Sequence, residues 1–171
     1  MFRAILVCML ITLATTARGD LSKGFGFVYG TPNAPPLALR NRDGETVDLA
    51  ALRNRVVLVN FWAPWCPPCL AEMPSIERMY RRLRSAGVEV LAVHLGPNDA
   101  EAQLFLAKFR PALTFPILFD EVGAIAQGWG VDTLPMSFVV NKRGQLVYEA
   151  QGARRMDSPH LLGLFEGLTE Q

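Results

Sequence analysis

Two cysteines separated by two residues stand near the middle of the sequence, in the string Asn60-Phe-Trp-Ala-Pro-Trp-Cys66-Pro-Pro-Cys69. Cysteines at this spacing can close a small disulfide ring, and this pair follows an apolar run, 56–61, that predicts a buried strand. If a helix begins at the pair, its positive end favours thiolate and lowers a cysteine pKa from about 8.5 to between about 3.5 and 7.5. We therefore expect Cys66 to be the attacking thiolate and Cys69, one turn further on, to be the resolving thiol.

The pair has two simpler alternatives, a zinc half-site and a structural disulfide. Zinc would need two more ligands, and His94 and His160 do not stand in a metal-ligand spacing. A bridge over so short a loop would stabilise the fold little. We expect redox chemistry, with no metal and no cofactor other than the Cys66–Cys69 disulfide itself.

The neighbours of the pair suit a helix start that meets a partner molecule. Pro67 and Pro68 fit the first helical turn, where N–H groups have no helical partner, and a stiff loop limits how far the sulfurs separate. Trp65 is expected to shield one side of the pair and to give a partner a flat apolar platform. These three residues are predicted substrate contacts.

Length and charge limit the remaining possibilities. The chain has 171 residues, half of them apolar, which fits one packed domain. With 17 basic against 16 acidic side chains, its net charge of +1 gives no electrostatic case for binding nucleic acid.

The first residues have the pattern of an export signal. A short basic start is followed by an apolar run, 4–13, which contains the third cysteine, and by the small residues 14–17. We expect cleavage after Ala17, with retention as an inner-membrane anchor as the alternative. Residues 18–34 are predicted to be a flexible lead-in, and 35–171 the folded domain. Export would place the thiols in the periplasm or outside the cell, where disulfides persist.

The rest of the chain alternates strands and helices. This order, closed by a hairpin and a helix, predicts an α/β domain with a mixed sheet. Hairpins are predicted over 37–49 and 137–150, and single strands over 56–61, 88–95 and 117–119. One helix is predicted from the Cys pair to Gly87, and a second has a capping box at Asn98 and Glu101 and continues to Phe109. A short helix capped by Asp120 carries Val122, Ile125 and Trp129, and Ser158 and Pro159 open the last helix.

From about Pro35 to Gly152 the sequence resembles the TlpA/ResA-like branch of the thioredoxin superfamily, which are exported bacterial thiol–disulfide oxidoreductases. The matching stretches are VVLVNFWAPWCPPCLAEMP, GVEVLAV, FPILFD, GWGVDTLP and SFVVNKRGQLV. The resemblance implies the thioredoxin fold with an N-terminal hairpin and an inserted α/β unit over 98–119. We expect the protein to be a monomer. It also implies that Pro135 is a cis proline beside the dithiol. The backbone of Leu134 would then be free to pair with an extended substrate peptide.

Glu72 is the acid of most interest. It lies three residues after Cys69, on the same helix face, and many relatives of this branch have Glu here. It could accept the Cys69 proton or raise the thiol pKa, unless it is simply a solvated helix residue. Thioredoxin has a buried Asp where this chain has Asn60, which cannot titrate.

Met136 stands directly after Pro135, where relatives often have Thr. Its apolar thioether either alters the choice of partner or simply packs against its neighbours.

Dithiol–disulfide exchange in the reducing direction is the expected activity. The resemblance implies a membrane thiol-transporting reductase as electron donor and disulfides of apocytochrome c or copper-site proteins as substrates. An oxidase or isomerase stays open, because potentials in related folds range from about −270 to −120 mV. A Cu(I)-binding chaperone is a third interpretation, disfavoured by the tight Cys spacing and the lack of a matched histidine.

Overall fold

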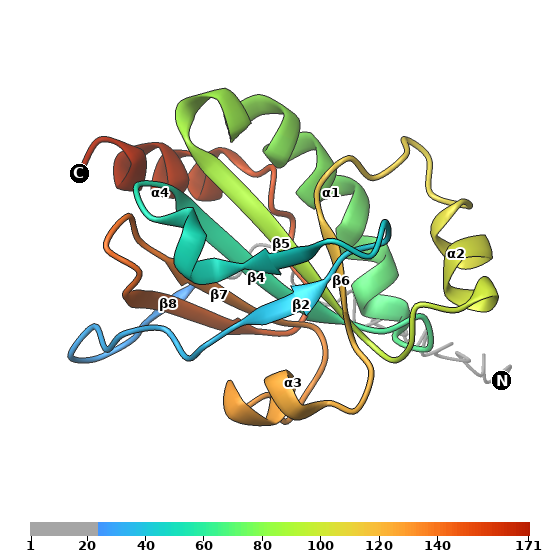
Figure 1. The fold of residues 1–171 in the computed structure, drawn as a ribbon. Helices are drawn as coiled ribbons and strands as arrows, with labels where there is room; N and C mark the ends of the chain where they lie inside the picture. The colour runs from blue at the N-terminus through green and yellow to red at the C-terminus, as the bar shows by residue number, and fades with distance from the viewer. Residues whose placement is uncertain (1–23) are drawn as a thin grey trace, which may run out of the picture.

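The computed structural model describes residues 24–171, and six strands of this part form one mixed sheet, in the order β1-β8-β7-β4-β5-β6 (Figure 1). The predicted signal peptide, 1–17, lies outside the described residues. The strands of the sheet are β1 (Gly26–Phe27), β4 (Val56–Trp62), β5 (Val88–Leu95), β6 (Ile117–Asp120), β7 (Met136–Val140) and β8 (Leu146–Gln151). Strands β2 (Ala38–Arg40) and β3 (Thr46–Asp48) form a separate hairpin. The helices are α1 (Pro67–Leu83), α2 (Ala100–Leu106), α3 (Ala124–Gly128) and α4 (Pro159–Thr169), with 3₁₀ turns at Leu49–Leu52 and Arg84–Ala86.

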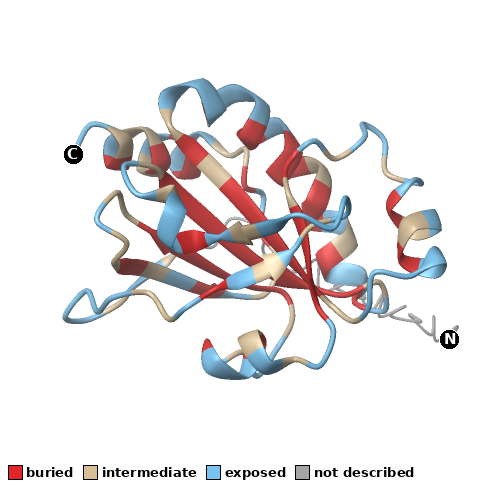
Figure 2. Cartoon of the chain, in the orientation of Figure 1, coloured by how far each residue is buried: buried red, intermediate tan, exposed pale blue. Residues whose placement is uncertain are grey.

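Strand β4 is the centre of the sheet and is buried along its whole length (Figure 2). It pairs in parallel with β5 and antiparallel with β7, so neither edge is free. Its side chains alternate between two apolar clusters, with Val56 and Leu58 on one face and Val57 and Val59 on the other. A strand buried on both faces has a continuous apolar sequence, which is why the sequence predicts it so directly.

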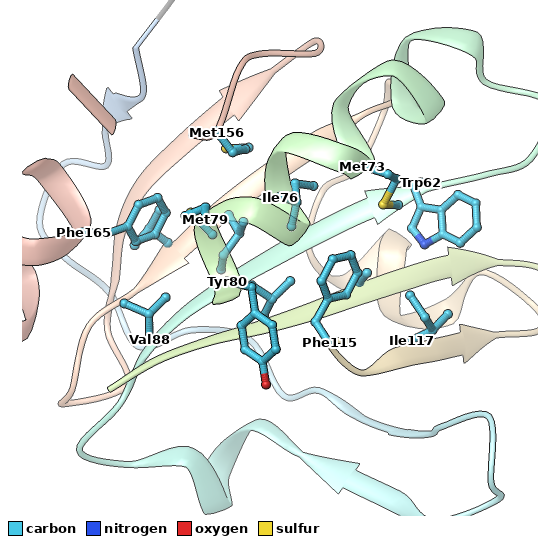
Figure 3. Packing of buried hydrophobic residues seen from close by; sticks show 14 of the residues in the cluster. Trp62, Met73, Ile76, Met79, Tyr80, Val88, Phe115, Ile117, Met156 and Phe165 are labelled. Carbon is cyan, nitrogen blue, oxygen red and sulfur yellow. The ribbon is translucent and has the colours of Figure 1, made fainter. Parts of the chain in front are cut away.

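Helices cover both faces of the sheet, as Figure 1 shows. Helices α1 and α4 lie on one face, where Met73, Ile76 and Met79 of α1 pack toward the sheet (Figure 3). Helix α3 covers the other face through Ala126, and the β2–β3 hairpin through Leu39 and Val47. The fold is thus the predicted α/β sandwich with a mixed sheet, an N-terminal hairpin and a helix–strand insertion, α2 and β6, after β5. No helix among residues 24–171 is long and apolar enough to cross a lipid bilayer.

Helix α1 begins where the sequence predicts but ends at Leu83, and a 3₁₀ turn covers the residues up to the predicted end at Gly87. Cys66 is its N-cap residue, and Gly87 ends the 3₁₀ turn that follows, with a φ of 98° that favours glycine. Pro74 lies inside the helix. The predicted central strands, both hairpins and the last helix, which Ser158 caps, are also confirmed.

Of the flexible lead-in predicted over 18–34, residues 18–23 lie outside the described part of the chain, and residues 24–34 are held by backbone hydrogen bonds to β8 and its turn. Residues 26–27 form β1 on the edge of β8, and Leu146 donates its N–H to the Pro32 carbonyl at 2.8 Å. Further along, the Ala34 N–H donates to the Gly144 carbonyl at 3.0 Å. A segment rich in Gly and Pro has no apolar period to predict it, but its backbone can satisfy the open edge of a strand.

Two predicted helix starts also need correction. Asp99, not Asn98, caps α2, by accepting the Ala102 N–H at 2.8 Å, and the helix ends at Leu106, before Phe109. Asp and Asn cap equally well, so adjacent candidates cannot be separated by type.

Helix α3 is shorter than predicted. Asp120 belongs to β6 and its Oδ2 accepts the Ala126 N–H at 2.8 Å, while Val122 and Trp129 lie outside the helix. The carboxylate therefore supports α3 from the preceding strand instead of standing at its N-cap, which Gly123 occupies.

Candidate active site

Cys66 and Cys69 are joined by a disulfide at the start of α1, with their Cα atoms 5.4 Å apart. The sequence places them here because β4 ends at Trp62 and the prolines Pro67 and Pro68 suit the first turn of the helix. Cys69 is almost fully buried, at 1% exposed, and Cys66 is 5% exposed. The geometry brings together the two sulfurs that the sequence predicts as a redox pair.

The start of α1 is electrostatically suited to a thiolate on Cys66. The Cys66 sulfur accepts the backbone N–H of Cys69 at 3.3 Å, and the first turn contains no acidic residue. The free N–H groups and the positive end of the helix dipole both favour a negative charge at this sulfur. This position explains why Cys66, and not Cys69, is suited to attack.

Glu72 is buried directly behind the first turn of α1, at 2% exposed. The alternative of a solvated helix residue is therefore wrong. Its Oε1 accepts the side-chain N–H of Asn60 at 2.8 Å, and its Oε2 accepts the backbone N–H of Arg154 at 2.7 Å. The Asn60 amide also donates to Ser137 at 3.0 Å, which ties α1, β4 and β7 together beneath the disulfide.

Burial raises the pKa of Glu72 from 4.5 to about 7, although the Arg154 N–H and charge and the Asn60 amide act in the opposite direction. A carboxyl group with this pKa is present in both protonation states near neutral pH. It can therefore take up a proton and release it again, which an ordinary surface glutamate cannot do efficiently.

The loop before β7 provides a second wall of the site. The Leu134–Pro135 peptide bond is cis, as the resemblance implies, and Pro135 is buried. Leu134 is half-buried and lines a hollow of about 460 Å³ together with Cys66 and Pro68. The predicted contacts Trp65, Pro68 and Leu134 thus meet around the Cys66 side of the disulfide. Pro67 is exposed at the start of the helix.

Trp65 stands between two hollows. It is 72% exposed, lines the hollow beside Leu134 and also lines a second hollow of about 490 Å³ that reaches α2. The second hollow has Phe105 on its wall and the acidic residues Asp99 and Glu101 at its side. An exposed aromatic ring between two concave surfaces is an arrangement that suits a protein or peptide ligand.

The other residues singled out in the sequence are structural. Trp62 is fully buried in the core (Figure 3), and the centre of its ring lies 5.1 Å from that of His94. His94 bonds through Nδ1 to the Gly96 carbonyl at 3.3 Å, but its Nε2 has no partner among the described residues. Burial lowers the pKa of His94. Met136 packs in the core on the α3 side.

Sequence reasoning missed Arg154, whose backbone N–H reaches Glu72 from 82 residues away. Its local sequence, Gly-Ala-Arg-Arg-Met, resembles any charged loop and gives no signal of burial. It also missed Ser137 as a partner of Asn60, which the register of β4 against β7 places directly opposite. Within residues 24–171 no group of three or more His, Cys, Asp or Glu side chains is arranged to hold a metal ion.

Comparison with known proteins agrees with this geometry. The family model described as Redoxin matches residues 30–162. Thiol-disulfide oxidoreductase ResA of Bacillus cereus is 30% identical over 89% of this chain and 87% of its own length. The Geobacillus thermodenitrificans protein of the same name is 32% identical over 83% of this chain and 80% of its own. A Chlorobium tepidum structure assigned as thiol:disulfide interchange protein DsbE superposes with a TM-score of 0.73 at 31% identity, covering 81% of this chain and 96% of that one.

Proposed function

The chain belongs to the Redoxin family and is a thiol–disulfide oxidoreductase of the ResA type, and from this premise we propose that it reduces selected disulfides of protein substrates outside the cytoplasm. The observation that carries the proposal is the Cys66–Cys69 disulfide at a helix start with the buried Glu72 one turn behind it. Export is supported by the signal pattern of residues 1–17.

The reaction begins with the reduced dithiol. The Cys66 thiolate attacks one sulfur of the substrate disulfide, which forms a Cys66–substrate disulfide and releases the other substrate sulfur as a thiolate. Cys69 then attacks the Cys66 sulfur, which re-forms the Cys66–Cys69 bond and releases the second substrate thiolate. Two electrons pass from the enzyme to the substrate, and the two released thiolates take up protons.

Glu72 is the proton acceptor for the second step. Cys69 is buried, and burial favours its thiol over the thiolate that must attack. A neighbouring carboxylate with a pKa of about 7 can remove the Cys69 proton and pass it on when the substrate leaves. This role depends on an ionisable carboxyl group and not only on the shape of the side chain. The substitution Glu72→Gln, which keeps the shape and removes the ionisable group, can therefore test it.

The substrate peptide lies in the hollow beside Leu134 and passes next to Trp65. This hollow exposes one side of Cys66 and is lined by Val131, Thr133 and Leu134 of the loop before β7. An extended backbone can pair there with the Leu134 backbone while its cysteine meets Cys66. The platform of Trp65 adds apolar contact without selecting one side chain.

The electron donor is a membrane thiol-transporting reductase, and the substrates are disulfides in proteins such as apocytochrome c or copper-site proteins. Both follow from the resemblance to the TlpA/ResA-like branch. The enzyme acts as a monomer, and the redox-active disulfide serves in place of a cofactor.

The reduction potential tests the direction of the reaction. Equilibration with glutathione redox buffers, followed by Trp fluorescence or by thiol trapping, should give a value nearer to about −270 mV than to −120 mV. A value at the oxidising end would overturn the assignment as a reductant and leave an oxidase or isomerase. Tight stoichiometric Cu(I) retention by the reduced protein against glutathione would instead indicate a copper chaperone.

A trapping variant tests the roles of the two sulfurs. Cys69→Ser should accumulate a mixed disulfide between Cys66 and its protein substrate, because the resolving thiol is absent. The matched variant Cys66→Ser should trap nothing. Equal trapping by both variants, or trapping by neither, would contradict the assigned roles.

A further inference from the structure

The buried guanidinium of Arg154 holds the turn that follows β8. Arg154 is 2% exposed, and its Nη2 donates to the carbonyls of Gln151 and Gly152, each at 2.8 Å. Its Nη1 donates to the carbonyl of Gly24 at 2.8 Å, and the guanidinium lies 5.1 Å from the centre of the Phe25 ring. A planar fork of N–H groups can satisfy several carbonyls at once, which fixes the backbone of this turn.

This turn presents one backbone N–H to each wall of the dithiol site. The Arg154 N–H donates to Glu72 Oε2 at 2.7 Å, and the Gly152 N–H donates to the Pro135 carbonyl at 2.9 Å. Gly152 has a φ of 78°, in the region that favours glycine, so the turn depends on this residue type. Ser75 adds a further link, since its hydroxyl oxygen accepts the Met156 N–H at 3.0 Å.

Arg154 also supplies the positive charge that acts on Glu72. The side chain that bonds the carboxyl from another element is neutral, since it is the Asn60 amide of β4, and Ser75 of α1 itself bonds only the backbone carbonyl of Glu72. The thiol of Cys69 stands one turn before Glu72 on the same helix. The charge of Arg154 therefore opposes the effect of burial and favours the ionised carboxylate.

We propose that Arg154 is a positioning residue of the dithiol site: its guanidinium fixes the 151–154 turn so that one N–H orients the Glu72 carboxylate and another orients the Pro135 loop, while its charge keeps Glu72 able to accept a proton. This inference rests on the proposed role of Glu72. It predicts that Arg154 acts on the acid–base behaviour of the site as well as on the stability of the fold.

The test compares Arg154→Gln with the matched variant Arg155→Gln. Arg155 is the next residue in the chain, is exposed, and pairs with Asp157 instead of the site. The first measurement follows the carboxyl carbon of Glu72 by NMR through a pH titration of the oxidised protein. Loss of the Arg154 charge should move the titration midpoint upward by about one pH unit or more, and R155Q should leave it unchanged.

The second measurement is the pH profile of disulfide reduction. The acidic limb of the R154Q profile should move to higher pH, and the rate at pH 6 should fall about tenfold if the limb moves by one pH unit. A Glu72→Gln background lacks this acidic limb, and there the same substitution should leave the pH dependence of the rate unchanged, because the titrating group is gone. A structural defect would lower the rate equally at every pH.

Arg154→Lys provides a variant that keeps the charge and loses the planar fork. The titration midpoint of Glu72 should stay close to that of the wild type, while the KM for a protein substrate rises because the Pro135 loop is less well fixed. This split can be measured even if R154Q does not fold.

The outcomes separate the two proposals. If E72Q leaves the pH profile unchanged, the proposed role of Glu72 is wrong. If E72Q removes the acidic limb but a folded R154Q leaves the Glu72 midpoint where it is, the inference about Arg154 is overturned. If R154K changes neither KM nor the midpoint, the positioning of the Pro135 loop by Arg154 is overturned.

Discussion

The side-chain amide of Asn60 donates a hydrogen bond of 2.8 Å to the carboxylate of Glu72. The joint between β4 and α1 therefore contains one acid and one uncharged partner. The Asn60 Oδ1 atom has no partner in the part of the chain described, so the amide serves mainly as a donor, to Glu72 and to Ser137. Because Asn60 cannot titrate, protonation at this joint is a property of Glu72.

Asn60→Asp should place a second carboxyl group against Glu72 and make the pair share one proton. Two buried carboxylates in contact cannot both ionise without a large cost. The variant should lose more than about 2 kcal/mol of unfolding free energy at pH 8, and much less at pH 5, where the pair retains a proton. Urea unfolding at the two pH values measures this, with Ser137→Ala as the control that loses only a neutral hydrogen bond. Equal losses at both pH values would show that the pair does not couple.

Glu72→Gln should flatten the pH dependence of stability between about pH 4.5 and 7. The folded-state pKa of Glu72 is raised from 4.5 to about 7, so the folded protein holds a proton that the unfolded chain releases. The contribution of this proton is fully present below pH 4.5 and is lost as the pH rises to about 7, a fall of about 3 kcal/mol. The measurement is the difference between wild-type and E72Q unfolding free energies across this range. A constant difference would mean that Glu72 titrates near its ordinary pKa.

Cys66 should react with an alkylating reagent faster than Cys69 in the reduced protein. Cys66 is the N-cap of α1 and borders an open hollow, whereas Cys69 is 1% exposed. The pH dependence of the Cys66 rate should give a pKa well below the ordinary value of about 8.5. Mass spectrometry after brief treatment identifies the modified residue. Faster labelling of Cys69 would reverse the assignment of attacking and resolving thiols.

Trp65→Ala should weaken the reduction of protein disulfides and spare that of small disulfides. An exposed Trp that contacts a partner typically contributes more than about 1 kcal/mol to binding, so KM for a protein substrate should rise about tenfold. Its removal should change stability by less than about 0.5 kcal/mol, because the ring is 72% exposed. Phe27→Ala, which removes a ring 74% exposed on the edge strand β1, is the matched control and should leave KM unchanged. A parallel loss of activity toward a small disulfide would contradict a role in substrate contact.

The sequence predicts the central strands and α1 well because burial on both faces and a proline-led helix start leave local signals. The run Val56–Trp62 and the segment Val88–Leu95 are apolar along almost their whole length, so their position in the sheet interior follows from composition. Cys66 and Cys69 could be assigned for a similar reason, since their chemistry depends on spacing and on a helix end.

The surroundings of Glu72 could not be predicted, because they depend on contacts distant in sequence. The residue looks like any glutamate on a helix, and its burial follows from the turn at Arg154 that closes over it. The ordering of residues 24–34 escaped prediction for a related reason. Their backbone is held by hydrogen bonds to β8 and its turn, and such bonds leave no trace in side-chain pattern.

The hydrogen bond from Arg154 to Glu72 joins residues 82 positions apart, which has a consequence for biosynthesis. A chain that emerges from its N-terminus releases both thiols long before the turn that completes their acid–base partner. Until the C-terminal strands have docked, Glu72 lacks the N–H of Arg154 that orients it. The resolving step by Cys69 therefore gains its complete proton acceptor only at the end of folding.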